Sequence, residues 1–399
     1  MSLSIFGKKL KGGRCHEEAV TCWFDIGLEL IMRVLYISPD DMLGLHFRRG
    51  WEKAFRYLGF DFVASTPGLK ELTNNLRERF DLIMTASGGE GIQQLPVDQL
   101  NECGTALVVN GLPFNSFRIS PDMQAPLADL AEVSYIEKFN TKLIWSQWEP
   151  DFVETFFSGY LDRGIPVISL PYAGDIIGSF EIGDLDLDIV FIGNLRHRRR
   201  GNLPLIRNLL KLSRGDRIKL IGGSDWQRYL GVSAEPMFNG QDPSGYYRRA
   251  IVSPNIHTKR QREHGIQLND RVFQIPASGG FQICDNPLVK RYFQVNELLF
   301  AHNQSYFLEM TDYFLRNPEK RIPYINAGAK AIATRHSYIN RVQTILDELE
   351  ISVKEHPIVE NFKLKRHTDI GICRKCEYFV ESRVMNLASL TRELRRKWM

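Results

Sequence analysis

Short apolar runs alternate with helix-like segments along most of this chain. The first pair is "MRVLYISP", an apolar run at 32–39, and "HFRRGWEKAFRYLG", a helix-like stretch that closes at Gly59. Because the apolar runs have no polar face, a strand made from one of them needs helices on both sides. Strands and helices that alternate in this way predict an α/β fold built on parallel sheets.

The alternation comes in two series, and 399 residues are too many for one ordinary core. We therefore assign residues 32–172 to an N-terminal Rossmann-like domain and 173–350 to a C-terminal one. Residues 1–31 fit neither series, and we interpret them as an N-terminal extension, either mobile or the product of an upstream start codon. Residues 351–399 form a C-terminal extension that ends in an amphipathic closing helix, "ESRVMNLASLTRELRRKW".

Composition bounds the class of protein. The longest apolar runs are shorter than a membrane span, and the first thirty residues carry Glu17, Glu18 and Asp25 where a signal peptide needs an apolar stretch. Six cysteines in so long a chain predict a reduced, cytoplasmic setting. The net charge is only +4, but basic clusters such as "RHRRR" and "KRQR" gather between 196 and 291. That local charge favours an anionic ligand.

Candidate ligand contacts follow the strands of the second series. In parallel sheets, ligands bind beyond the carboxyl ends of the strands. After "DIVFI" come Gly193, which permits close backbone approach, and Asn194, a hydrogen-bond donor; Arg198 and Arg199 could then face a diphosphate. The alternative for this basic cluster is a solvated turn.

The next two strands end in further polar residues. "LIGGSDW" at 220–226 is either a loop that stacks on a base or an ordinary turn. "SPNIH" places Asn255 and His257 at a strand end, where we expect Asn255 to contact ribose or sugar. His257 is a second donor-site candidate, although a lone histidine is more often structural.

The segment "NDRVFQIPASGGFQICD" completes the series. As a helix, it puts Arg271 and Gln274 on one face near its start, where a guanidinium can meet phosphate and an amide can bond ribose hydroxyls. Gly279 and Gly280 end the helix before the strand "FQICD", and we expect close backbone approach there.

These segments resemble the donor domain of GT-B glycosyltransferases, and in particular the CgeB-like group. The matching stretches are "VISLPYAGD", "DIVFIGNLRHRRR", "SPNIH", "NDRVFQIPASGGFQICDN" and "NPEKRIPYINAGAKAIATRHSYINRV", within about residues 165–345. The resemblance implies two Rossmann-like domains facing a central cleft, with residues 32–172 binding the acceptor. It also implies a hexosyltransferase-type enzyme that takes a nucleotide sugar, with a UDP-sugar as the expected donor, and needs no metal or cofactor.

One departure concerns charge. Many retaining GT-B enzymes carry two glutamates eight positions apart, and this chain has Ile266 and Gln274 there. Gln274 can hydrogen-bond a ribose but supplies no negative charge. The mode of donor binding is therefore open.

Three further groups of residues are candidates for metal binding or catalysis. The D-x-D spacing of Asp184, Asp186 and Asp188 suggests a metal site, but these carboxylates precede a strand, so we interpret them as solvated. "CRKC" at Cys373–Cys376 offers half of a zinc site, which "CHEEAVTC" at 15–22 could complete. For a catalytic base we name His46, with three acidic competitors: Asp40, Asp41 and Glu90.

Two rivals remain beside the transferase. The first is a non-catalytic protein that binds nucleotide sugars or polyanions on the same scaffold. The second is a sugar transferase that modifies nucleic acid, for which the basic clusters would contact phosphates. The acceptor is open between a glycan, a protein, a small molecule and a nucleic acid.

Overall fold

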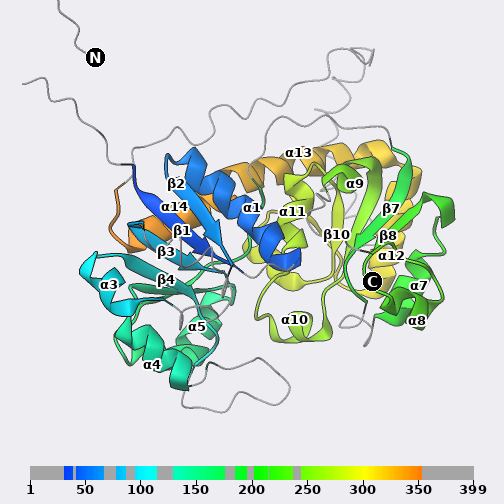
Figure 1. The fold of residues 1–399 in the computed structure, drawn as a ribbon. Helices are drawn as coiled ribbons and strands as arrows, with labels where there is room; N and C mark the ends of the chain where they lie inside the picture. The colour runs from blue at the N-terminus through cyan, green and yellow to red at the C-terminus, as the bar shows by residue number, and fades with distance from the viewer. Residues whose placement is uncertain are drawn as a thin grey trace, which may run out of the picture. The chain divides into compact units, whose positions relative to one another are not determined.

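A computed structural model describes most of the chain between Ile31 and Ser352 (Figure 1). The described residues are 31–38, 42–66, 78–86, 95–114, 128, 130–175, 185–195, 202–213, 215–236 and 244–352. Among them, no helix is long and apolar enough to cross a membrane.

The first sheet has six parallel strands in the order β2-β1-β3-β4-β5-β6. They are β1 (Arg33–Ile37), β2 (Asp61–Ser65), β3 (Leu82–Thr85), β4 (Ala106–Asn110), β5 (Leu143–Ser146) and β6 (Val167–Ser169). The helices between them are α1 (Met42–Tyr57), α3 (Val97–Glu102), α4 (Leu130–Lys138), α5 (Pro150–Phe156) and α6 (Ser158–Leu161).

Strand β1 shows why the apolar runs need two layers of helices. Leu35 and Ile37 point into one buried cluster, and Val34 and Tyr36 point into another. Successive side chains of a strand face opposite sides of the sheet, so an unbroken apolar run fills a core on each side.

The second sheet has five parallel strands in the order β11-β10-β9-β7-β8. They are β7 (Leu187–Ile192), β8 (Ile218–Ile221), β9 (Ala250–Asn255), β10 (Gln282–Cys284) and β11 (Leu299–Phe300). The helices of this half are α7 (Leu203–Leu209), α8 (Asp225–Leu230), α9 (Ser244–Arg249), α10 (Lys259–His264), α11 (Arg271–Ala277), α12 (Gln304–Arg316) and α13 (Ile322–Ala331). A π-helical turn, Ile332–His336, follows α13.

The last described helix, α14 (Tyr338–Glu348), returns to the first core. Its residues Val342, Ile345 and Leu346 are buried in the cluster that also holds Trp51 of α1. The rings of Trp51 and Tyr338 meet edge to face, with centroids 5.2 Å apart.

The segment that joins the two series of strands is held by the start of α14. Gly174 pairs with Ser337 in an isolated parallel bridge. Arg341 donates from Nε to the carbonyl of Pro171 at 2.7 Å and from Nη2 to that of Tyr172 at 3.1 Å. The stretch "HSYINR" therefore clamps this connection.

The predicted fold class is confirmed, because two parallel α/β sheets are present and each is covered by helices, as in a GT-B fold.

Candidate functional site

The strand order of the second sheet locates a crevice for a ligand. From β7 the chain moves to β8 on one side and then crosses to β9 on the other. In doubly wound sheets, ligands bind outside the carboxyl ends of the strands where the order reverses in this way. The site is therefore expected where β7 and β9 end, beside Gly193 and Asn255.

Arg271, the first residue of α11, bridges these two strand ends. Its Nη1 donates to the carbonyl of Ile192 at 3.0 Å and its Nη2 to that of Ile256 at 3.2 Å. The side chain is 6% exposed, and the guanidinium lies over the ring of Phe191. Arg271 thus ties the strands together at the predicted site, and its contact with a diphosphate stays a prediction.

Glycines bring the ends of β7 and β8 close together. Gly193 has a φ of 140°, and its amide donates to the carbonyl of Ile221 at 2.8 Å. A Cβ on Gly222 would stand 2.5 Å from the carbonyl oxygen of Gly193, so only glycine fits. The side chain of Asn194 accepts from the amide of Gly223 at 2.9 Å.

Trp226 is fully buried at this corner. Its indole Nε1 donates to the carbonyl of Gly193 at 3.0 Å, and its ring packs edge to face on Phe191. A ring with no exposed face cannot stack on a base, so that interpretation of "LIGGSDW" is wrong and the turn is the correct one.

A chain of side-chain amides runs from Val272 to Asn269. Gln282 Nε2 donates to the carbonyl of Val272 at 2.8 Å, and Asn255 Nδ2 donates to Gln282 Oε1 at 2.8 Å. Asn269 Nδ2 then donates to Asn255 Oδ1 at 2.9 Å. Asn255 is completely buried, and both ends of its amide are used within the protein.

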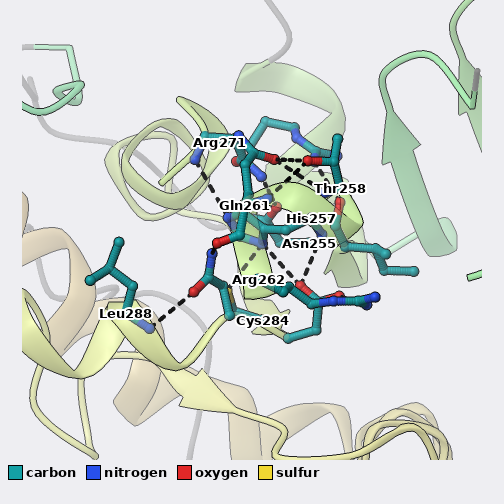
Figure 2. A network of polar contacts seen from close by, with 12 residues as sticks. Asn255, His257, Thr258, Gln261, Arg262, Arg271, Cys284 and Leu288 are labelled. Atoms are coloured by element: carbon teal, nitrogen blue, oxygen red, sulfur yellow. Dashed lines mark hydrogen bonds and ion pairs between the residues drawn. The ribbon is translucent and has the colours of Figure 1, made fainter. Parts of the chain in front are cut away.

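His257 belongs to a second network, drawn in Figure 2 with Arg262 and Cys284. Oδ1 of Asp285 lies 2.9 Å from the backbone nitrogen of His257 and 2.9 Å from its Nδ1. Arg262 donates to the other carboxylate oxygen of Asp285 at 2.8 Å. Burial opposes ionisation of Asp285, but the His257 hydrogen bond and the Arg262 charge outweigh it and lower the pKa of that carboxyl.

The same residues include a set of metal-type ligands. One ligand atom from each of His257, Cys284 and Asp285 lies within 4.8 Å of the others. The carboxylate of Asp285 is already shared by His257 and Arg262, and burial raises the pKa of the Cys284 thiol. We interpret the cluster as a hydrogen-bond network, because a metal would have to displace these contacts and take the thiol as thiolate.

Gln274 and Ile266, the two positions that carry glutamates in many retaining GT-B enzymes, are both buried. Gln274 is 5% exposed, and its Nε2 donates to the carbonyl of Ala173 at 3.0 Å. Ile266 packs in a core cluster of the first sheet. The two positions that carry glutamates in many retaining GT-B enzymes are thus used here for packing and for holding the connecting segment.

Gly279 and Gly280 have separate structural reasons. Gly279 has a φ of 75°, which favours glycine after α11. A Cβ on Gly280 would stand 2.8 Å from Cβ of Tyr247 and 2.9 Å from Cγ2 of Ile275. Their part in approaching a ligand stays a prediction.

Several predicted residues lie outside the described part of the chain or have side chains that are not described. Arg198, Arg199, Asp40, Asp41, Glu90, Asp184, Cys373 and Cys376 lie outside it. His46 lies in α1, but its side chain is not described. Asp186 forms an ion pair with Arg249, and Asp188 with Arg217.

Sequence reasoning missed four members of the two networks: Asn202, Asn269, Gln282 and Asp285. Asn202 donates to the carbonyl of His257 at 2.9 Å and accepts from Arg262 at 2.6 Å. One signal was available, since Asn269 is the first residue of the predicted helix "NDRVFQIPASG" and Asp285 is the last residue of the predicted strand "FQICD". Polar residues at the carboxyl ends of parallel strands are the usual site candidates.

One family model matches part of the chain. Residues 198–347 match the family described as glycosyl transferase-like. The match contains α7, β8 to β11 and all of α14 except its last residue, and it includes Asn255, Asn269 and Arg271. No curated protein matches the chain.

Similar solved structures include HepE from Anabaena in complex with UDP, at 9% identity and a TM-score of 0.47, covering 80% of this chain and 100% of that one. A glycosyltransferase from Rickettsia africae has 11% identity and a TM-score of 0.48, covering 81% and 100%. The spinosyn rhamnosyltransferase SpnG complexed with thymidine diphosphate has 9% identity and a TM-score of 0.40, covering 79% and 100%.

Proposed function

We propose that this chain is a glycosyltransferase that binds a nucleotide sugar at the carboxyl ends of β7 and β9. The supporting observation is that the family match over residues 198–347 contains Asn255 and Arg271, which lie where the strand order reverses. The family match supports the class of enzyme, and the topological rule supports the place.

The strand ends have properties suited to a diphosphate. Gly193, with a φ of 140°, leaves the backbone without a side chain at the end of β7, so a ligand can approach the main chain closely there. The Arg271 guanidinium brings positive charge to the same strand ends. In the proposed reaction the bond between the anomeric carbon and the diphosphate oxygen breaks and the nucleoside diphosphate leaves with the bonding electrons. The acceptor oxygen bonds that carbon, and its proton passes to a base, for which His46 is the candidate.

The finer features belong to the proposal. We propose a hexosyl donor, with UDP-sugars as the first to test, and a mechanism that needs no metal. Acceptor binding falls to residues 32–172, with His46 as the candidate base, and a cytoplasmic location is the expectation. The CgeB-like group remains the family subgroup that the motifs suggest.

The test measures nucleotide binding first and turnover second. UDP, GDP and dTDP, each alone and as sugar conjugates, are added to the full chain, and the unfolding temperature is recorded. A ligand that binds only the folded state raises stability with the logarithm of its saturation. Release of the nucleoside diphosphate is then followed with the conjugate that stabilises most, with and without EDTA. Absence of a shift with every nucleotide and conjugate contradicts the proposal.

A second candidate is a non-catalytic nucleotide-sugar binder. The observation that favours it is Gln274, whose amide is bonded to Ala173 where many retaining enzymes carry a glutamate. A thermal shift with a nucleotide sugar, but no release of nucleoside diphosphate with any acceptor class, would support the binder over the enzyme.

A further inference from the structure

We propose that the side-chain oxygen of Asn269 accepts a hydrogen bond from a hydroxyl group of the bound nucleotide sugar, and so selects the ligand. This inference rests on the proposed function and names a contact within that site. Asn269 is 6% exposed, and its Oδ1 has no hydrogen-bond partner in the part of the chain that the structure describes.

The orientation of this amide follows from the chain of amides behind it. The carbonyl of Val272 can only accept, so the nitrogen of the Gln282 side chain must face it. Gln282 then offers its oxygen to Asn255, and Asn255 offers its oxygen to Asn269. Each donor and acceptor is therefore assigned in turn, and the chain ends with an acceptor at Asn269 Oδ1.

The backbone of Asn269 is held from a second direction. Its amide nitrogen lies 3.4 Å from Nε2 of His257. Nδ1 of the same ring faces the carboxylate of Asp285, whose pKa is lowered. A carboxylate accepts from Nδ1–H, so Nε2 of the neutral ring is the acceptor for Asn269. His257 and Asn255 thus act as positioning residues for Asn269.

An unpaired buried acceptor costs free energy unless a ligand or water satisfies it. Phosphate oxygens are acceptors and cannot serve Asn269, whereas a hydroxyl can donate to it. The hydroxyls of a nucleotide sugar belong to its ribose or to its transferred sugar.

The neighbourhood supports a ligand at this point. Asn269 bonds to Asn255, the last residue of β9, at the strand end where the order reverses. Two residues further on, Nε of Arg271 is a buried donor without a partner in the described part of the chain. Because Asn269 is almost fully buried, a hydroxyl reaches it only when the covering side chains rearrange, as is common on binding.

The experiment compares ligands that differ by one hydroxyl. Calorimetry measures the affinity of the full chain for UDP, 2′-deoxy-UDP, 3′-deoxy-UDP and a UDP-sugar, or the corresponding set for whichever nucleotide stabilises the chain. The variants are Asn269→Ala and Asn269→Ser. Asn101→Ala is the control. It removes one hydrogen bond of a side-chain amide, from Asn101 Nδ2 to the carbonyl of Lys138, in the first half of the chain.

We expect the natural chain either to bind one deoxy analogue about 3- to 10-fold more weakly than UDP, or to bind the UDP-sugar about 3- to 10-fold more tightly than UDP, and both Asn269 variants to lose that difference. If Asn269 had only a structural role, the substitutions would weaken the binding of all ligands by the same factor. If the variants lose only the difference in affinity between the UDP-sugar and UDP, the contact is to the transferred sugar. If they lose the difference between UDP and a deoxy analogue, the contact is to ribose.

Three results overturn the inference. If the natural chain binds UDP, the UDP-sugar and both deoxy analogues equally, no hydroxyl is read, and this holds even if the variants fail to fold. If the variants keep the discrimination of the natural chain, another residue reads the hydroxyl. If the natural chain binds no nucleotide or nucleotide sugar at all, the proposed function fails first and the contact fails with it.

Discussion

One carboxylate oxygen of Asp285 accepts two hydrogen bonds from His257, one from its backbone nitrogen and one from Nδ1, both at 2.9 Å. Its other oxygen accepts from Arg262. The three residues come from the end of β9, from α10 and from the end of β10. This buried charged group therefore ties together two strand ends and the helix between them.

Asp285→Asn should destabilise the chain by about 3 kcal/mol, because it removes one partner of a buried ion pair and turns an amide group toward Arg262. Urea unfolding measures the change. The control is Asp312→Asn, which breaks an exposed pair with Arg316 and should cost less than about 1 kcal/mol. Equal effects of the two substitutions would contradict the structural role of Asp285.

The pH dependence of that contribution has a definite sign. The folded-state pKa of Asp285 lies below its ordinary value, so the stabilisation is present above about pH 4 and is lost as the pH falls through the lowered pKa. The Asp285→Asn variant should lose less stability than the natural chain over that acid range.

Gln274→Glu should destabilise the chain and should not improve nucleotide binding. The amide of Gln274 donates to the carbonyl of Ala173, and a carboxylate would face that oxygen with no proton to give. A buried unpaired charge or acceptor costs about 1–3 kcal/mol or more. Unfolding and UDP affinity are measured at pH 8 and pH 5.

Acid should relieve this defect, because a protonated carboxyl can donate to Ala173 again. Gln274→Met is the uncharged comparison, and its stability should not vary with pH relative to the natural chain. Tighter nucleotide binding by Gln274→Glu would mean instead that the site is a weakened form of the glutamate-bearing one.

Much of the fold could be predicted because each strand signals itself locally. The side chains of "RVLYI" alternate between two cores. Gly59, just after the end of α1, has a φ of 87° that favours glycine. Such features depend on a few neighbouring residues. The parallel order then follows from the alternation with helices.

The destination of α14 could not be predicted in the same way. Its sequence shows an apolar face, but nothing local says that Tyr338 packs on Trp51, nearly three hundred positions earlier, and not on the second sheet. The site residues share this difficulty. Asn255 and His257 were predicted at a strand end, where they lie, yet the bonds that occupy them come from Gln282, Asn269 and Asp285.

Gly222→Ala should damage the predicted site. A Cβ there would stand 2.5 Å from the backbone oxygen of Gly193, and backbone cannot move aside as a side-chain tip can. We expect a loss of about 1–3 kcal/mol and weaker nucleotide binding. The control is Gly245→Ala in α9, where the new Cβ would meet no atom within 4 Å beyond its chain neighbours and its own helix backbone. It should be neutral or stabilising by up to about 1 kcal/mol, and equal losses in both variants would contradict the argument.

His336 gives the chain a second pH dependence, at less acidic pH than that of Asp285. It is 8% exposed, and its Nε2 donates to the carbonyl of Tyr292 at 2.9 Å. Burial lowers the pKa of His336 from 6.5 to about 4, and the charges of Arg341 and Arg335 act in the same direction. The Tyr292 bond and Glu297 oppose the shift without cancelling it.

The unfolded chain therefore binds a proton at His336 in a range where the folded chain does not. Stability from this residue is complete above about pH 6.5 and is lost as the pH falls toward about 4, by up to about 3 kcal/mol. His336→Gln keeps a donor for Tyr292 and removes the titration. Urea unfolding of both proteins at pH 7 and pH 4.5 should show a larger loss for the natural chain, and parallel curves would rule out this role for His336.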